Sequence, residues 1–109
     1  MKRKVLLIYT GGTIGMEKDY QTGSLQPFNF SKIFQKIPEM KLLECEVSVH
    51  PFKIPLDSSD MGPAEWKIIA NYIGKNYEKF DGFLVLHGTD TMSYSASALS
   101  FMLKNLRKP

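Results

Sequence analysis

The stretch KVLLIYTGG at residues 4–12 decides the fold of this 109-residue chain. Residues 5–9 form an uninterrupted apolar run, and the glycines that follow end it. A continuous run of this length, as opposed to an alternating one, is typical of a strand that is buried on both faces of a parallel sheet. Residues 4–9 are therefore predicted to be the first strand of such a sheet.

Two further strands are predicted downstream. Residues 43–49 alternate between apolar and polar side chains, which predicts an edge strand with one exposed face. Residues 82–86, GFLVL, form a short apolar run that again favours a buried strand. Residues 16–27 show neither a helical nor a strand period and are predicted to form a mobile surface loop.

Three helices are predicted between and after these strands. A short helix at residues 31–37 has Asn29 or Ser31 as its cap and ends at Pro38. A second helix opens at Pro63. Its expected buried stripe consists of Trp66, Ile69, Ala70, Ile73 and Tyr77. A third helix covers residues 91–105, and its expected inward face consists of Met92, Ala96, Leu99, Met102, Leu103 and Leu106.

This alternation of strands and helices predicts one α/β domain over residues 1–109. Its sheet is open and mostly parallel, with flanking helices and right-handed crossovers. Ligands of such sheets bind outside the carboxyl ends of the strands. Polar clusters follow the predicted strands: TGGT at residues 10–13, DSSD at residues 57–60 and HGTDT at residues 87–91. We expect these clusters to converge at one edge of the sheet.

The composition excludes several classes of protein. At 43% hydrophobic and 23% charged residues, the chain is globular and not disordered. Its longest apolar run is far too short to cross a bilayer or to serve as a secretory signal, so no membrane partner and a cytoplasmic location are expected. The single cysteine, Cys45, fits a reducing compartment. The net charge of +3 resides largely at the chain ends, which does not favour a nucleic-acid partner.

Each polar cluster has a structural interpretation beside a functional one. The first cluster is either a tight glycine turn or a device that exposes Thr13 as a nucleophile near backbone N–H groups. Thr89 and Asp90 either cap a helix or provide a hydroxyl nucleophile and a carboxylate that accepts hydrogen bonds from an ammonium group. Asp57 and Ser58 either form a turn or contact a substrate. The spacing of the carboxylates does not suit a metal site, and none is expected.

Together, the motifs resemble those of the bacterial-type L-asparaginases. The matching stretches are YTGGTIGM at residues 9–16, DSSDM at residues 57–61 and the segment at residues 81–92 that contains HGTDT. The likeness continues to Phe101, so essentially the whole chain is similar to the amino-terminal part of that family. The DSSD form of the second motif and the absence of a signal peptide resemble the cytoplasmic type I branch.

The resemblance implies an incomplete amino-terminal asparaginase domain. The implied activity is hydrolysis of L-asparagine to L-aspartate and ammonia through a threonine nucleophile, with neither metal nor organic cofactor. Thr13 is similar in position to the first catalytic threonine and Thr89 to the second. Asp90 is similar to the partner of the second threonine and to the ligand of the substrate ammonium group.

The resemblance also implies the substrate contacts. Ser58 matches the serine that binds the substrate α-carboxylate, and Asp57 lies beside it. Backbone groups near Thr13, Gly88 and Thr89 would hold the amide oxygen and the substrate. In its full-length form the family assembles as homodimers or homotetramers.

Two departures from the family pattern bear on activity. The loop tyrosine that activates the first threonine falls near Ser24 in this chain, and Tyr20 is a candidate substitute. The family's catalytic lysine lies beyond residue 109. We therefore expect the 109-residue chain to be a portion with little asparaginase activity alone.

Three alternatives remain at this stage. The first is a related glutaminase-asparaginase, and the second is the asparaginase-like subunit of an archaeal-type glutamyl-tRNA amidotransferase. The third is a non-catalytic α/β domain that binds an amino acid.

Overall fold

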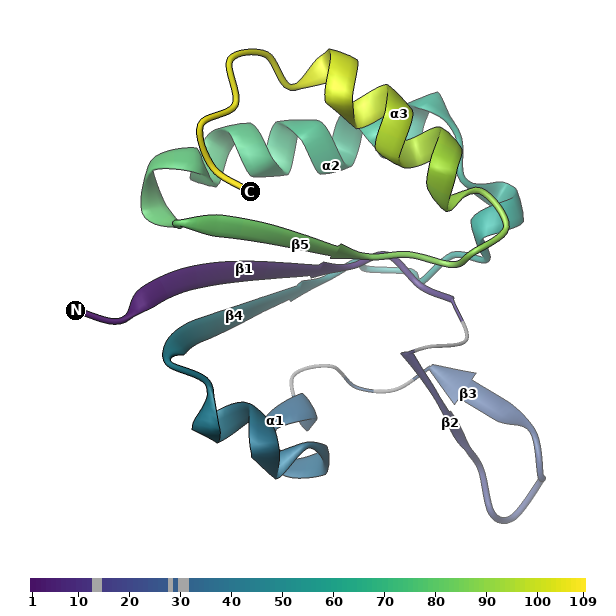
Figure 1. The fold of residues 1–109 in the computed structure, drawn as a ribbon. Helices are drawn as coiled ribbons and strands as arrows, with labels where there is room; N and C mark the ends of the chain where they lie inside the picture. The colour runs from purple at the N-terminus through teal and green to yellow at the C-terminus, as the bar shows by residue number, and fades with distance from the viewer. Residues whose placement is uncertain (13–14, 28, 30–31) are drawn as a thin grey trace.

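The computed structural model describes residues 1–12, 15–27, 29 and 32–109. Within them a three-stranded sheet has the order β4-β1-β5, with β1 at Arg3–Tyr9, β4 at Cys45–Pro51 and β5 at Gly82–Leu86. Both neighbours run parallel to β1. Figure 1 shows these strands pointing the same way, with their carboxyl ends together. The predicted α/β fold with a parallel sheet is confirmed.

Helices lie on both sides of this sheet (Figure 1). Helices α2 (Pro63–Asn76) and α3 (Met92–Met102) cover one face. On the other side, α1 (Ile33–Lys36) and the 3₁₀ segment η3 (Pro38–Leu42) lie beneath β4. The 3₁₀ turn η5 (Tyr77–Lys79) follows α2 directly.

The central strand β1 contributes to apolar clusters on both faces. Leu6 and Ile8 pack with Ile69 and Ile73 of α2 and with Met61. Leu7 and Tyr9 point the opposite way, because successive side chains of a strand alternate. They pack against Phe34, Met40, Val47, Val49 and Leu86. Burial on both faces is what the continuous apolar run at residues 5–9 predicts.

Residues 16–27 differ from the predicted irregular loop. They form an antiparallel hairpin of β2 (Met16–Lys18) and β3 (Leu25–Pro27). The turn is closed by Asp19, whose carbonyl accepts the N–H of Gly23 at 2.7 Å, and Gly23 has a φ of 72°. Strands of three residues are too short to display a period, so the pattern could not reveal them.

The predicted inward face of the last helix is wrong in part. Ser95 is buried and Leu99 is half-buried, whereas Met92, Ala96, Met102 and Leu106 are exposed. The helix also ends at Met102 and does not continue to residue 105. The cause is a polar contact, because Trp66 of α2 donates its indole N–H to the Ser95 hydroxyl at 2.8 Å. A small polar residue therefore takes the inward position that the apolar pattern assigned to larger neighbours.

The edge strand and the first helix also differ in detail from expectation. β4 is an edge strand within the described sheet, but its polar face is partly covered, because His50 stacks on Tyr72 of α2 with ring centroids 3.7 Å apart. The first helix is shorter than predicted, and its candidate cap Ser31 lies outside the described residues. The carbonyl of Asn29, the other candidate cap, accepts the N–H of Lys32 at 2.9 Å.

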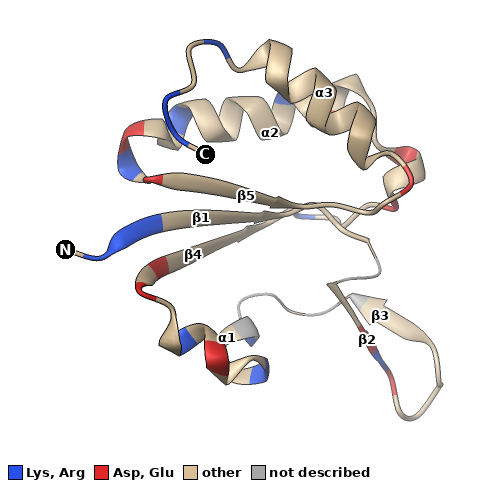
Figure 2. Cartoon of the chain, viewed as in Figure 1, with Lys and Arg blue, Asp and Glu red and all other residues tan. Residues whose placement is uncertain are grey.

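Charge is distributed unevenly along the strands. Figure 2 shows basic residues where β1 begins and along the final segment of the chain, and acidic residues beyond the carboxyl end of the sheet. The acidic residues there are Asp57, Asp60 and Asp90. Among the described residues no helix is long and apolar enough to cross a membrane.

Candidate active site

The first motif is anchored where β1 ends. Thr10 is buried, and its hydroxyl donates to the carbonyl of Leu86 at 2.7 Å, while its own N–H donates to the same oxygen at 3.1 Å. The carbonyl of Thr10 accepts the N–H of Leu56 at 2.9 Å. The segment that follows β1 is thereby fastened both to the end of β5 and to the connection that precedes the second motif.

Glycines allow the three motifs to touch. A Cβ atom on Gly11 would lie 2.0 Å from the carbonyl oxygen of Leu56, and one on Gly12 would lie 2.9 Å from the Cα atom of Gly88. A Cβ atom on Gly88 would lie 2.7 Å from the Cβ and Oγ atoms of Ser58. Any larger residue at these points would force backbone segments apart. The three motifs therefore meet at Gly88, which lies against the backbone of Gly12 and the side chain of Ser58.

The second motif forms the 3₁₀ turn η4 (Ser58–Asp60). Asp57 caps this turn, because its Oδ1 atom accepts hydrogen bonds from the N–H and the hydroxyl of Ser59, both at 3.0 Å. These hydrogen bonds stabilise the carboxylate and lower the pKa of Asp57. Ser58 is 3% exposed, and its carbonyl accepts the hydroxyl proton of Thr91 at 2.6 Å. This last bond ties the second motif to the third.

The third motif lies between β5 and α3, with Thr89 and Asp90 exposed. Behind it, the buried His87 ring has Nδ1 at 2.7 Å from the carbonyl oxygen of Gly88 and Nε2 at 2.7 Å from the Ser95 hydroxyl. A carbonyl oxygen only accepts, so Nδ1 carries a proton. In the neutral ring Nε2 then accepts from Ser95, whose oxygen in turn accepts from Trp66. The histidine thus supports the motif from behind and does not face the site.

A hollow of about 240 Å³ lies between the motifs. Its lining residues are Gly12, Met16, Asp57, Ser58, Gly88, Thr89 and Asp90. It therefore gathers the site residues predicted from the second and third motifs. Met16 was not singled out from the sequence, and its one signal was its position directly after the glycine motif.

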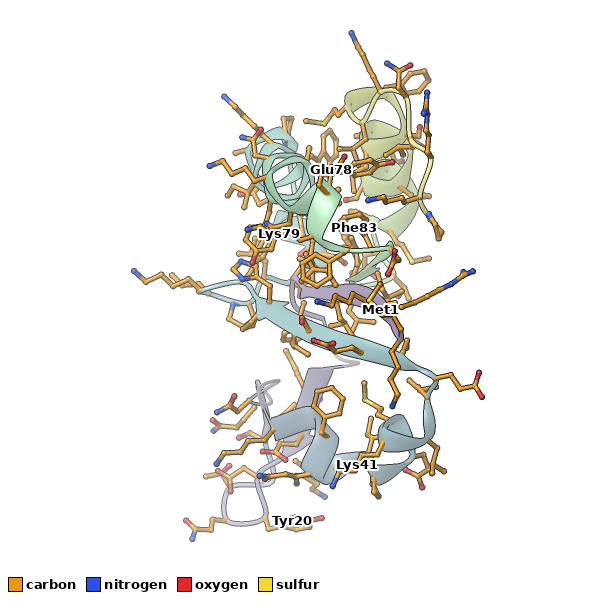
Figure 3. All side chains as sticks on the ribbon, turned by 90° about the vertical axis from the view of Figure 1, so that its left-hand side faces the viewer. Met1, Tyr20, Lys41, Glu78, Lys79 and Phe83 are labelled. Atoms are coloured by element: carbon orange, nitrogen blue, oxygen red, sulfur yellow. The ribbon has the colours of Figure 1, made fainter. Side chains whose placement is uncertain are left out.

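Two predicted site residues, Thr13 and Tyr20, are not among the described residues that line this hollow. Thr13 lies outside the described residues, between Gly12 and Gly15. Tyr20 is 95% exposed and lines a different hollow with Glu17 and Lys36. Figure 3 shows Tyr20 at the outer end of the β2–β3 hairpin.

The polar side chains that line the hollow are carboxylates and hydroxyls. The carboxylates of Asp57 and Asp90 favour a cationic group, and the hydroxyls of Ser58 and Thr89 can donate or accept hydrogen bonds. The described lining residues include no lysine, arginine or histidine. In the part of the chain that the structure describes, no group of three or more His, Cys, Asp or Glu residues is placed to hold a metal ion.

The chain is similar to known proteins over nearly its whole length. The model of the asparaginase N-terminal domain matches residues 4–109. L-asparaginase 1 of Escherichia coli strain K12 is 44% identical over 109 residues, which are 99% of this chain and 32% of that protein. A subunit of the glutamyl-tRNA(Gln) amidotransferase of Pyrococcus abyssi is 42% identical over 108 residues, 96% of this chain and 24% of that protein.

The solved structures extend this likeness to three dimensions. The crystal structure of L-asparaginase I from Vibrio cholerae matches with a TM-score of 0.87 and 46% identity. The match covers 100% of this chain and 33% of the other. The chain therefore spans a third or less of the length of these relatives.

Proposed function

Because the chain belongs to the family of N-terminal asparaginase domains, we propose that it supplies the nucleophile-bearing part of an L-asparagine amidohydrolase. The reaction converts L-asparagine and water to L-aspartate and ammonia. The observation that carries the proposal is the packing of Gly88 against both Gly12 and Ser58. It brings three motifs, far apart in the sequence, around one hollow of a size suited to an amino acid.

In the proposed mechanism the hydroxyl of Thr13 attacks the side-chain amide carbon of asparagine. The C–N bond breaks, ammonia leaves with the proton from the hydroxyl, and a water molecule then hydrolyses the ester to aspartate. Backbone N–H groups of the glycine motif and of Gly88 and Thr89 stabilise the negative charge on the amide oxygen. Thr89, with Asp90 as its partner, acts as the second threonine.

Substrate orientation follows from the charges of the hollow. Asp90 accepts hydrogen bonds from the α-ammonium group, and the hydroxyl of Ser58 donates to the α-carboxylate. Asp57, already engaged with Ser59, adds to the negative potential that favours the ammonium end. The side-chain amide is then directed toward the glycine motif.

A threonine hydroxyl needs a base to act at neutral pH. The described lining residues provide no lysine or histidine, and the resemblance places the family's lysine after Pro109. We therefore propose that the 109-residue chain alone turns over asparagine slowly. Tyr20 stays a candidate for the loop tyrosine, which would require the β2–β3 hairpin to approach the hollow.

The remaining proposals concern the whole protein. It works in the cytoplasm as a homodimer or homotetramer, without metal or organic cofactor. The lone cysteine, Cys45, fits a reducing compartment. Sedimentation of the active form would give the number of chains in the assembly.

The test is ammonia release from L-asparagine and L-glutamine. Two proteins are compared: the 109-residue chain, and a chimera in which the remaining part of E. coli L-asparaginase 1 is joined after Pro109. We expect asparagine turnover by the chimera and little by the chain alone. Thr13→Val and Thr89→Val should each lower kcat by about 10³-fold or more. Ser97→Ala, on the exposed side of α3, is the control and should leave kcat unchanged.

The assay also separates the alternatives. A preference for glutamine would favour a glutaminase-asparaginase. The likeness to the Pyrococcus abyssi protein keeps a role in a larger amidotransferase as the second candidate. A folded chimera that binds asparagine, as measured by calorimetry, but releases no ammonia would indicate a binding domain and would refute the proposed hydrolysis.

A further inference from the structure

Tyr9, the last residue of β1, reaches from the core to the glycine motif. The residue is completely buried, and its ring lies in the cluster that Leu7 forms on the face opposite α2. The far end of the ring lies against Gly15. A Cβ atom on Gly15 would be 2.1 Å from the Cε2, Cζ and Oη atoms of Tyr9. Gly15 is buried, and only a glycine fits over this ring.

The hydroxyl of Tyr9 makes a second contact with the same segment. It donates to the carbonyl oxygen of Gly12 at 3.4 Å, and that oxygen also accepts the N–H of Gly15 at 3.1 Å. Gly12 and Gly15 are the described residues on either side of Thr13 and Ile14. One buried side chain therefore contacts both ends of the segment that carries Thr13.

Core packing alone does not account for this arrangement. A phenylalanine would fill the apolar cluster equally well, whereas a buried tyrosine requires a partner for its hydroxyl. Here the partner belongs to the glycine motif. Burial also raises the pKa of the Tyr9 phenol, which keeps the group protonated and able to donate.

We propose that Tyr9 is a positioning residue for the nucleophile: its ring supports Gly15 and its hydroxyl holds the Gly12 carbonyl, and these two residues flank the segment that carries Thr13. This inference rests on the proposed function of Thr13. Tyr9 is completely buried, so its effect on the reaction passes through the residues that it contacts.

The kinetic test uses the chimera described above. Tyr9→Phe keeps the ring and removes the hydrogen bond, so kcat should fall about tenfold. KM should stay constant, because Ser58 and Asp90 are untouched. Gly15→Ala should lower kcat further, since its Cβ atom would overlap the ring. In a Tyr9→Ala background the same Gly15→Ala change should cost little, because the overlap is gone.

Leu7→Ala is the matched control for lost packing. Leu7 lies on the same strand, in the same cluster, and is also buried, but it makes no contact with the glycine motif in the hydrogen bonds or close approaches of the described residues. It should lower the stability of the protein while kcat per folded molecule stays unchanged. Strict additivity of the Tyr9 and Gly15 effects on kcat would overturn the inference.

A second measurement does not depend on activity. In the 109-residue chain, the amide of Gly15 should exchange its hydrogen about tenfold faster in Tyr9→Phe than in the parent. The amide of Leu56, which donates to Thr10, is the internal reference. A parent chimera that is silent on asparagine would refute the proposed function alone. Unchanged exchange of Gly15 in Tyr9→Phe would refute the role of Tyr9, whatever the activity.

Discussion

At the scale of single residues, the hydroxyl of Ser95 is the centre of a buried hydrogen-bond network. It accepts from the indole of Trp66 and lies 2.7 Å from Nε2 of His87. Ser95→Ala would leave the indole nitrogen of Trp66 and Nε2 of His87 without this partner, so the free energy of unfolding should fall by about 1–3 kcal/mol. Urea denaturation followed by circular dichroism measures this loss. Ser97→Ala, on the exposed side of the same helix, should change it by less than about 0.5 kcal/mol.

The stacked ring of His50 predicts a dependence of stability on pH. Burial lowers the pKa of His50 in the folded chain. As the pH falls below the ordinary histidine value of about 6.5, the unfolded chain therefore takes up the proton first. The free energy of unfolding is highest above that pH and decreases below it. His50→Phe keeps an aromatic ring over Tyr72 without the proton.

The measurement compares urea midpoints of the two chains at about pH 7.5 and about pH 5, on either side of the ordinary histidine value. The parent should lose more stability than His50→Phe over this interval. An equal loss in both chains would assign the pH dependence to other groups.

At the scale of elements, α2 is held to the sheet by one row of side chains. Ile69 is 0% exposed, whereas its neighbour Ile68 is 55% exposed. Ile69→Ala should lower the free energy of unfolding by about 2–5 kcal/mol, because it removes buried methyl groups and leaves a cavity. Ile68→Ala makes the same chemical change on the outer side, and we expect a loss of less than about 1 kcal/mol. Similar losses from both changes, in urea denaturation, would contradict this orientation of α2.

The elements that the sequence predicts correctly are those whose pattern has one explanation. β1, β5 and α2 have continuous apolar runs or a helical apolar stripe with clear boundaries, and their places in the fold follow from them. The inward face of α3 could not be predicted in the same way. It depends on the contact between Ser95 and Trp66, which are far apart in the sequence.

The same distinction applies to the site, where the convergence of the motifs could be predicted and their close contacts could not. Convergence of the motifs follows from the parallel sheet, because each motif comes after a strand. The contact of Gly12 with Gly88 depends on how closely two loops approach, which no local pattern encodes. The approach of the Tyr9 ring to Gly15 is likewise a property of the folded chain. The sequence pattern predicts only that residue 9 is an apolar residue of a strand.

At the scale of the whole molecule, the chain exposes more surface than a self-contained domain of its mass. The accessible surface is 7882 Å², compared with about 6,100 Å² expected for a folded monomer of this mass. The radius of gyration of 14.7 Å likewise exceeds the roughly 13 Å expected for its length. One group of exposed apolar side chains lies on α3 and the segment after it. The exposed side chains there are Met92, Tyr94, Phe101, Met102 and Leu106.

An apolar surface of this kind predicts self-association of the 109-residue chain. Phe101 is 82% exposed and contributes the most exposed aromatic ring on α3. Phe101→Ser should therefore shift the chain toward the monomer in sedimentation velocity over a range of concentrations, with little change in the free energy of unfolding. Tyr20→Ser is the control, because Tyr20 is also an exposed aromatic residue but lies on the hairpin, away from α3. If both variants sediment like the parent, association does not involve the α3 surface. The polar groups around that surface are then sufficient for it to remain exposed to solvent.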